Sequence, residues 1–128
     1  MKSTIRAALE SRLSTLTPSW PTCWEAVDFT VPQDTGWQRA TLLMGETTAL
    51  GAGPNAPSQW QGVFHIVAWT PARTGPAAAQ ARASAIMNHF SRGLALGNVI
   101  ILQASFGPAL VEPKLYGLPV KIPFVFHS

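Results

Sequence analysis

Residues 59–70, with the sequence QWQGVFHIVAWT, carry the clearest strand pattern of the chain. Every second residue from Val63 to Trp69 would point to one face of an extended strand, and the residues between them would point to the other face. Both sets are largely apolar, and His65 is the exception. Because apolar side chains gain free energy when they leave water, we expect both faces of this strand to be covered.

Four other segments predict strands. Apolar and aromatic residues recur in short runs bounded by turn residues at positions 24–29, 37–46, 98–104 and 118–127. In the last segment, Pro119 and Pro123 remove two backbone donors from any strand ladder. We therefore expect that strand to lie at a sheet edge or beside a bulge.

Two segments have helical periodicity. The first covers residues 3–16, and the second, which is rich in alanine, follows Gly75-Pro76 and extends to Arg92. Apolar stripes that would face the sheet consist of Ile5, Leu9, Leu13 and Leu16 in the first helix and Ala79, Ala83, Ile86 and Phe90 in the second. Arg82 falls outside its stripe, so we expect it on the outer, solvated face of the helix.

The order of these segments predicts the fold class. A helix, strands, a second helix and further strands, without internal repeats, favour a single α+β domain over residues 1–128. Its sheet would be mixed and mainly antiparallel, with about four to five strands, and the two helices would pack on it.

Residues 47–58 separate two of the predicted strands. They contain two glycines, two prolines and no charged side chain, so they fit neither a helix nor the interior of a sheet. Loops of about 12 residues without structure of their own are usually functional. We therefore expect a mobile loop that becomes ordered against a partner.

Composition limits the function classes. The chain has 128 residues, of which only 12% are charged, about half the usual proportion. A surface so poor in charge suits subunit contacts. The net charge is +3, but the basic residues are scattered and form no tract that would follow a phosphate backbone. The single cysteine, Cys23, fits a reducing cytosol, and no segment predicts a signal peptide or a membrane span.

No motif predicts catalytic chemistry. His65, His89, His127 and Cys23 are each far in sequence from another metal ligand, and Cys23 lies in no nucleophile signature. We therefore expect no catalytic residue, no metal and no cofactor. Two alternatives stay open: a small oligomeric cytoplasmic enzyme with a site between subunits that uses His65, His89 or a carboxylate, and a weak nucleic-acid-binding protein.

Several short motifs, taken in order, resemble one family. They are residues 21–29 (PTCWEAVDF), residues 39–43 (RATLL), the loop at 47–58, the strand before Thr70-Pro71 and residues 118–124 (LPVKIPF). With the two helices, they make the whole chain similar to the tail terminator proteins of tailed phages and prophages. These are also called tail completion proteins, of the minor tail protein U type. Ala26 departs from the pattern, in which Asn follows the Trp-Glu pair.

The resemblance implies a structural protein rather than an enzyme. Such a subunit would form a homo-oligomeric ring, typically of six copies, at the head-proximal end of the tail tube, where it stops tube polymerisation and offers a surface for joining the head. Its partners would be the tail tube protein and the head-tail connector protein, and DNA would pass through the ring without specific binding. It would belong to the virion tail, assembled in the host bacterial cytoplasm, without contact with a membrane.

The expected subunit or tail-tube interface follows from the same resemblance. It would include the loop and the two arginines of the second helical region: Leu50, Gly51, Gly53, Pro54, Asn55, Trp60, Arg73 and Arg82. The arginines would line the lumen or a seam between subunits. The alternative is that both lie on a solvated helix face.

Overall fold

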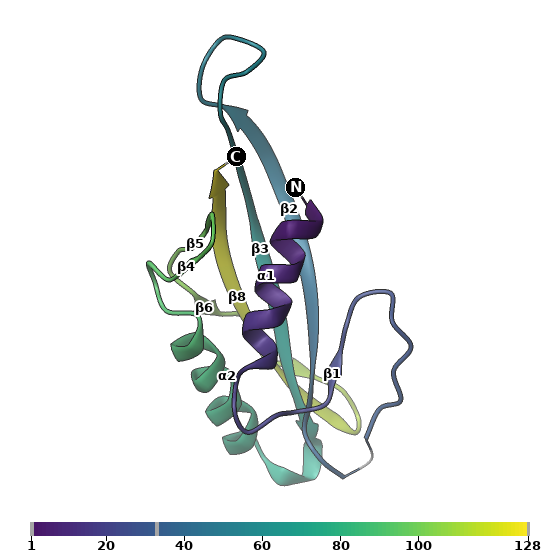
Figure 1. Cartoon of the computed structure of the whole chain (residues 1–128). Coiled ribbons are helices and arrows are strands. Elements are labelled where there is room, and N and C mark those ends of the chain that lie inside the picture. The colour runs from purple at the N-terminus through teal and green to yellow at the C-terminus, as the bar shows by residue number, and fades with distance from the viewer. Residues whose placement is uncertain (1, 33, 128) are drawn as a thin grey trace.

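The computed structural model describes residues 2–32 and 34–127. Its elements, in chain order, are α1 (Lys2–Ser14), β1 (Thr22–Cys23), β2 (Trp37–Ala49), β3 (Ser58–Pro71), the 3₁₀ turn η1 (Ala72–Thr74), α2 (Ala77–His89), β4 (Ala95–Leu96), β5 (Val99–Ile101), β6 (Ser105–Phe106), β7 (Leu110–Val111) and β8 (Leu115–His127). Three long strands, β2, β3 and β8, dominate the molecule (Figure 1).

The strands within residues 2–32 and 34–127 form one eight-stranded sheet. Its main order is β1-β2-β3-β8-β5-β4, and β6 and β7 also pair with β8. Only the β1–β2 pair is parallel, and every other pair is antiparallel. The prediction of a mixed, mainly antiparallel α+β fold with two α-helices is confirmed. The strand number exceeds the expected four to five because several strands have only two residues.

The sequence predicts that the prolines of β8 mark a sheet edge or a bulge. The strand lies inside the sheet, so the prediction of an edge is wrong, and its register with β3 contains no bulge. It pairs with β3 without a break from Gln59↔His127 to Pro71↔Leu115. The carbonyls of Pro119 and Pro123 accept from Gly107 and Leu102 on its other side. A residue's N–H and C=O point to the same side of an antiparallel strand, so the two missing donors face the short, interrupted strands β5 and β6. The hydrogen bonds between β3 and β8 are therefore unaffected by the two prolines.

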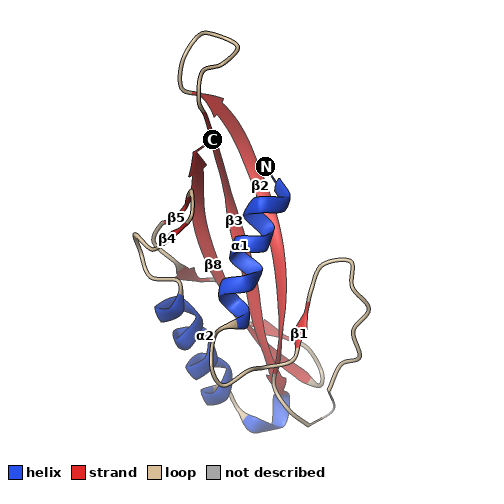
Figure 2. Cartoon of the chain, in the orientation of Figure 1, coloured by secondary structure: helices blue, strands red, loops and turns tan. Residues whose placement is uncertain are grey.

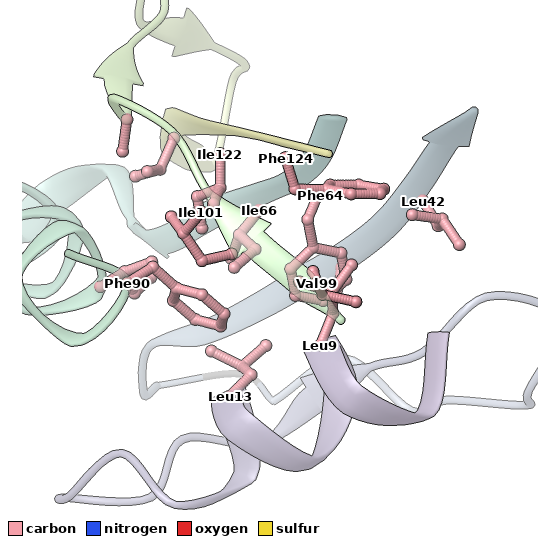
Figure 3. Close-up of a cluster of buried hydrophobic side chains, with 14 of the residues drawn as sticks. Leu9, Leu13, Leu42, Phe64, Ile66, Phe90, Val99, Ile101, Ile122 and Phe124 are labelled. Atoms are coloured by element: carbon pink, nitrogen blue, oxygen red, sulfur yellow. The ribbon is translucent and has the colours of Figure 1, made fainter. Parts of the chain in front are cut away.

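Both helices cover the same face of the sheet (Figure 2). Leu9 and Leu13 of α1 and Phe90, at the end of α2, point toward apolar residues of β2, β3, β5 and β8 (Figure 3). The predicted stripes are confirmed: the side chains Ile5, Leu9, Leu13, Leu16, Ala79, Ala83, Ile86 and Phe90 are all buried. This face holds the main core.

The other face of the sheet is covered at one end only. There the rings of Trp37 and Trp69 stack with their centroids 5.9 Å apart. The centroid of the Phe29 ring lies 5.4 Å from that of Trp37. Leu115 packs against this second cluster. Farther along β3, Val63 and His65 are only partly buried. The expectation that both faces of the strand would be covered therefore holds at this end and fails beyond it.

Two close approaches explain glycines in the long strands. A Cβ at Gly62 would lie 2.5 Å from the carbonyl oxygen of Leu43, and a Cβ at Gly117 would lie 2.7 Å from the Trp69 ring. Neither distance is compatible with a real side chain. The two glycines therefore let β2 approach β3 and let the Trp69 ring lie over β8.

Several predicted boundaries differ from the structure. The first helix ends at Ser14 instead of residue 16, and the strands predicted at 37–46 and 118–127 extend to Ala49 and begin at Leu115. The predicted strand at 24–29 is wrong: β1 lies before it, and residues 25–27 form a turn in which Ala26 has φ +58°. The segment 98–104 forms a strand only at Val99–Ile101. The second helix ends at His89 instead of Arg92, because the chain turns back and Gly93, with φ +87°, donates to the carbonyl of Ile101.

Candidate assembly surfaces

The loop between β2 and β3 is shorter than predicted, and it projects beyond the rest of the molecule (Figure 1). Strand pairing continues to Ala49↔Ser58, so only residues 50–57, the hairpin tip, connect the strands. The backbone amide of Leu50 donates to the carbonyl of Pro57 at 2.8 Å, and that of Ala56 donates to the carbonyl of Gly53 at 3.2 Å. The tip is uncharged and almost wholly exposed. Its predicted mobility stays a prediction.

The end of the β2–β3 hairpin, residues 45–62, is called the arm below, and Trp60 lies near its base, next to the core. It pairs with Thr47 on one side and Phe126 on the other, and its side chain packs partly buried against the main core. Its indole Nε1 is buried and has no hydrogen-bond partner within the described residues. A bulge between Met44 and Thr47 interrupts the register of β2 opposite this region. The structure thus makes Trp60 the base of the arm, and its predicted role in an interface stays a prediction.

Arg73 lies at the opposite end of β3 from the tip. It follows that strand in η1, and β3 spans about 45 Å at the usual rise per residue. Its Nη2 pairs with Asp34 Oδ1 at 2.8 Å, and both side chains are about three quarters exposed. Such an exposed pair is worth little free energy. Arg73 is therefore accessible to a partner, as the sequence led us to expect.

Arg82 is buried, so the prediction that it lies on the outer face of its helix is wrong. Only 4% of the residue is exposed. Its Nε donates to Gln38 Oε1 at 3.0 Å, its Nη1 donates to the carbonyl of Pro18 at 2.6 Å, and its guanidinium lies 4.9 Å from the centroid of the Trp20 ring. Burial lowers the pKa of Arg82 from its ordinary value. It joins α2 to the segment before β1.

The structure therefore does not bring the predicted interface residues together. The hairpin tip and Trp60 lie at one end of β3, Arg73 lies at the other end, and Arg82 is inside the molecule.

Eight large apolar side chains are exposed at separate places on the molecule, and sequence reasoning missed most of them. They are Val27, Val31, Leu43, Leu50, Leu102, Phe106, Leu110 and Val111. Val27 and Val31 lie between β1 and β2, whereas Leu102 and Phe106 lie in the β5–β6 region on the outer side of β8. These two pairs are called the β2-side patch and the β8-side patch below. The signal in the sequence is weak, since isolated apolar residues among prolines and glycines have no periodicity.

The uncovered part of the sheet face carries a mixed row of side chains. His65 lies between Thr41 of β2 and Lys121 of β8. Burial, together with the positive charge of Lys121, lowers the pKa of His65 below its usual 6.5. His65 is therefore neutral at pH 7.

Metal-binding and membrane-spanning features are also missing from the described part of the chain. Residues 2–32 and 34–127 contain no group of three or more His, Cys, Asp or Glu side chains that would hold a metal ion. None of the helices in these ranges has the length and apolar character that crossing a membrane requires. Cys23 is a free, half-buried thiol.

Comparison with known proteins shows first which solved structures share the fold. Two solved structures share the fold over nearly their whole length. One, whose name states no function, has a TM-score of 0.76 and 23% identity, and the match covers 98% of this chain and 95% of that one. The other, from the virion of a native gene transfer agent particle, has a TM-score of 0.61 and 17% identity, with coverages of 97% and 95%. No curated protein matches the sequence.

The family model of phage tail terminator proteins matches residues 4–124. The chain belongs to the phage tail terminator protein family. The resemblance inferred from the sequence is confirmed, and the family is one of structural proteins that are not enzymes. The alternative of an enzyme with a site between subunits is therefore not retained.

Proposed function

We propose that the chain is the subunit of a tail terminator ring of six copies at the head-proximal end of a tail tube. The ring stops tube polymerisation, offers the surface that joins the head-tail connector, and lets DNA pass without specific binding. It becomes part of the virion tail after assembly in the host cytoplasm. Membership of the family supports this role, and so does the fold shared with a chain from a gene transfer agent virion.

The observation that carries the proposal is the separation of the two apolar patches. A cyclic ring with more than two copies uses a head-to-tail contact, in which each subunit offers two different surfaces. The β2-side patch and the β8-side patch are two such surfaces, and β2, β3 and β8 lie between them. Phe106 is 48% exposed and Val27 is 58% exposed, which is costly unless a neighbour covers them.

The hairpin tip is the proposed contact with the tail tube. Leu50, Gly51, Gly53, Pro54 and Asn55 lie at the far end of the arm, and an uncharged exposed tip gains free energy when a partner covers it. In this proposal the tip is mobile in the free subunit and becomes ordered on the tube. Arg73, at the opposite end of β3, faces the lumen or a seam between subunits.

The test combines mass and activity. Light scattering behind size exclusion, over a concentration series, should show a species with about six times the 13.7 kDa of one chain. A variant with residues 50–57 replaced by Asn-Gly, a two-residue turn, should keep its fold but fail to cap tubes. A variant with Pro54→Ala and Asn55→Ala is the matched control for length. Tails of normal length in the presence of the shortened variant would refute the role of the tip.

A further inference from the structure

We propose that the cavity beside Arg82 is a binding site for a carboxylate group. The cavity has a volume of about 160 Å³ and is lined by Ser19, Trp20, Thr22, Gln38 and Arg82, among others. This inference does not depend on the ring, because it follows from a buried charge and its surroundings within one chain.

The first step is the missing counter-charge. Arg82 is only 4% exposed, yet no carboxylate of the described residues lies within 4.0 Å of its nitrogens. Its partners are a carbonyl, an amide oxygen and the Trp20 ring, all of which are neutral. A buried charge without a charged partner is costly in free energy. An anion in contact with this guanidinium would remove much of that cost.

The second step is the direction of the hydrogen bonds. Gln38 accepts from Arg82 through Oε1 and donates through Nε2 to Thr22 Oγ1, which in turn donates to the carbonyl of Trp20. These contacts use the Nε of Arg82 and one terminal nitrogen. The other, Nη2, makes no hydrogen bond within the described part of the chain. A guanidinium donor therefore remains beside the cavity, while Gln38 Oε1 and the Pro18 carbonyl already accept from Arg82.

The third step is the class of ligand. The cavity combines a planar guanidinium with the hydroxyl of Ser19 on its rim. Guanidinium groups bind carboxylates through short, charge-assisted hydrogen bonds. The Trp20 ring lies over this guanidinium, with its centroid 4.9 Å from Cζ of Arg82. A carboxylate has about the right size, since it fits easily into 160 Å³. Its source is either a side chain of another chain in an assembly or a free carboxylate ion.

The test places a carboxylate in the cavity. A Ser19→Glu variant should be more stable than the matched uncharged variant Ser19→Gln, by about 3–5 °C in Tm. Combination with Arg82→Met should abolish the difference between the two. If Arg82→Met does not fold, comparison of the two Ser19 variants at low and high salt replaces it, because screening should reduce the difference.

A second measurement separates the two sources. Acetate, compared with chloride at equal ionic strength, is titrated against the wild-type protein while the Nε–H resonance of Arg82 is followed by NMR. A saturable shift assigns the site to free carboxylates. No shift, with Ser19→Glu more stable than Ser19→Gln, assigns it to a carboxylate carried by another chain. No shift and equal stability of the two Ser19 variants would overturn the proposal.

Discussion

Arg12 and His89 bind each other's backbone. The Nε of Arg12 donates to the carbonyl of His89 at 3.0 Å, and the ring Nε2 of His89 lies 2.9 Å from the carbonyl of Arg12. The same Nε2 also lies 2.7 Å from the Thr15 hydroxyl. Because a carbonyl only accepts, the contact with Arg12 is a hydrogen bond when Nε2 carries the proton. The hydroxyl of Thr15 donates to the same carbonyl at 2.7 Å. This reciprocal pair ties the C-terminal ends of α1 and α2 together above the core.

Burial of His89 and His65 predicts a loss of stability in acid. Burial lowers the pKa of His89, its hydrogen bond to the Arg12 carbonyl acts in the opposite direction, and the positive charges of Arg12 and Arg82 lower the pKa further. Burial and the positive charge of Lys121 lower the pKa of His65. In the unfolded chain both histidines have the ordinary pKa of 6.5. As the pH falls below 6.5, the unfolded chain therefore binds protons at these side chains that the folded chain does not bind. Stability is fully present above this pH and is lost as the pH falls through the lowered pKa values.

Urea unfolding at about pH 7.5 and about pH 5 measures this effect. The His89→Gln variant should lose part of the difference between the two conditions, and a variant with both His65→Gln and His89→Gln should lose most of it. An unchanged difference in the double variant would contradict this account.

Truncation of Phe90 should damage the core. The side chain is fully buried and its ring centroid lies 5.9 Å from that of Phe64. We expect Phe90→Ala to lower the free energy of unfolding by about 3–5 kcal/mol, since it removes apolar contacts and leaves a cavity. Ser91→Ala, at the exposed neighbouring position, should change it by less than about 0.5 kcal/mol in either direction. Denaturant titration compares the two, and equal effects would disprove the assignment of Phe90 to the core.

A methyl group at Gly62 should disturb the β2–β3 arm. The new Cβ would meet the Leu43 carbonyl, which belongs to the neighbouring strand and has little room to move. We expect Gly62→Ala to cost about 1–3 kcal/mol. Gly53→Ala, in the tip, meets nothing within 4 Å and serves as the control, with an expected change between zero and a gain of about 1 kcal/mol. Thermal unfolding of both variants provides the comparison.

Two variants mixed together would distinguish a head-to-tail ring from a symmetric pair. Val27→Glu should disable the β2-side patch, and Phe106→Glu should disable the β8-side patch. Alone, each variant should remain a monomer. When the two variants are mixed, the intact β8-side patch of the Val27→Glu variant should bind the intact β2-side patch of the Phe106→Glu variant. The result should be a heterodimer and nothing larger, because both remaining patches are disabled. Light scattering measures the mass of the species in the mixture. Rings, or no association at all, would contradict the claim that these patches form the contact between subunits.

Periodicity was sufficient where one face of an element meets the core. Phe64 and Ile66 in β3, and Ile86 in α2, are buried as their spacing predicts, because burial on one face repeats with the geometry of the element. The segment 98–104 illustrates the limit. Its pairing with β8 breaks after Ile101, and nothing in a local apolar run indicates where a neighbouring strand carries prolines.

Arg82 shows a second limit. Arg82 lies three residues after Ala79 and four before Ile86, a spacing that puts it on the buried face of α2, and only its charge favoured an outward position. Its long apolar stem and planar group let it stay on that face and reach Pro18 and Gln38. These partners are 64 and 44 residues away in sequence. The exposed patches were missed for a related reason, since exposure is decided by which segments lie nearby and not by the residues themselves.

The unbroken path of β3 has a mechanical consequence. Its backbone runs from the hairpin tip to η1 with β2 on one side and β8 on the other, and both ladders are antiparallel. A force on the tip along the strand loads these rows of hydrogen bonds in shear, so that many must break together. The register shift between Met44 and Thr47 interrupts the β2–β3 ladder, whereas the β3–β8 ladder continues past it. The hairpin therefore resists a force along its strands and transmits it from the tip to the opposite end of the sheet.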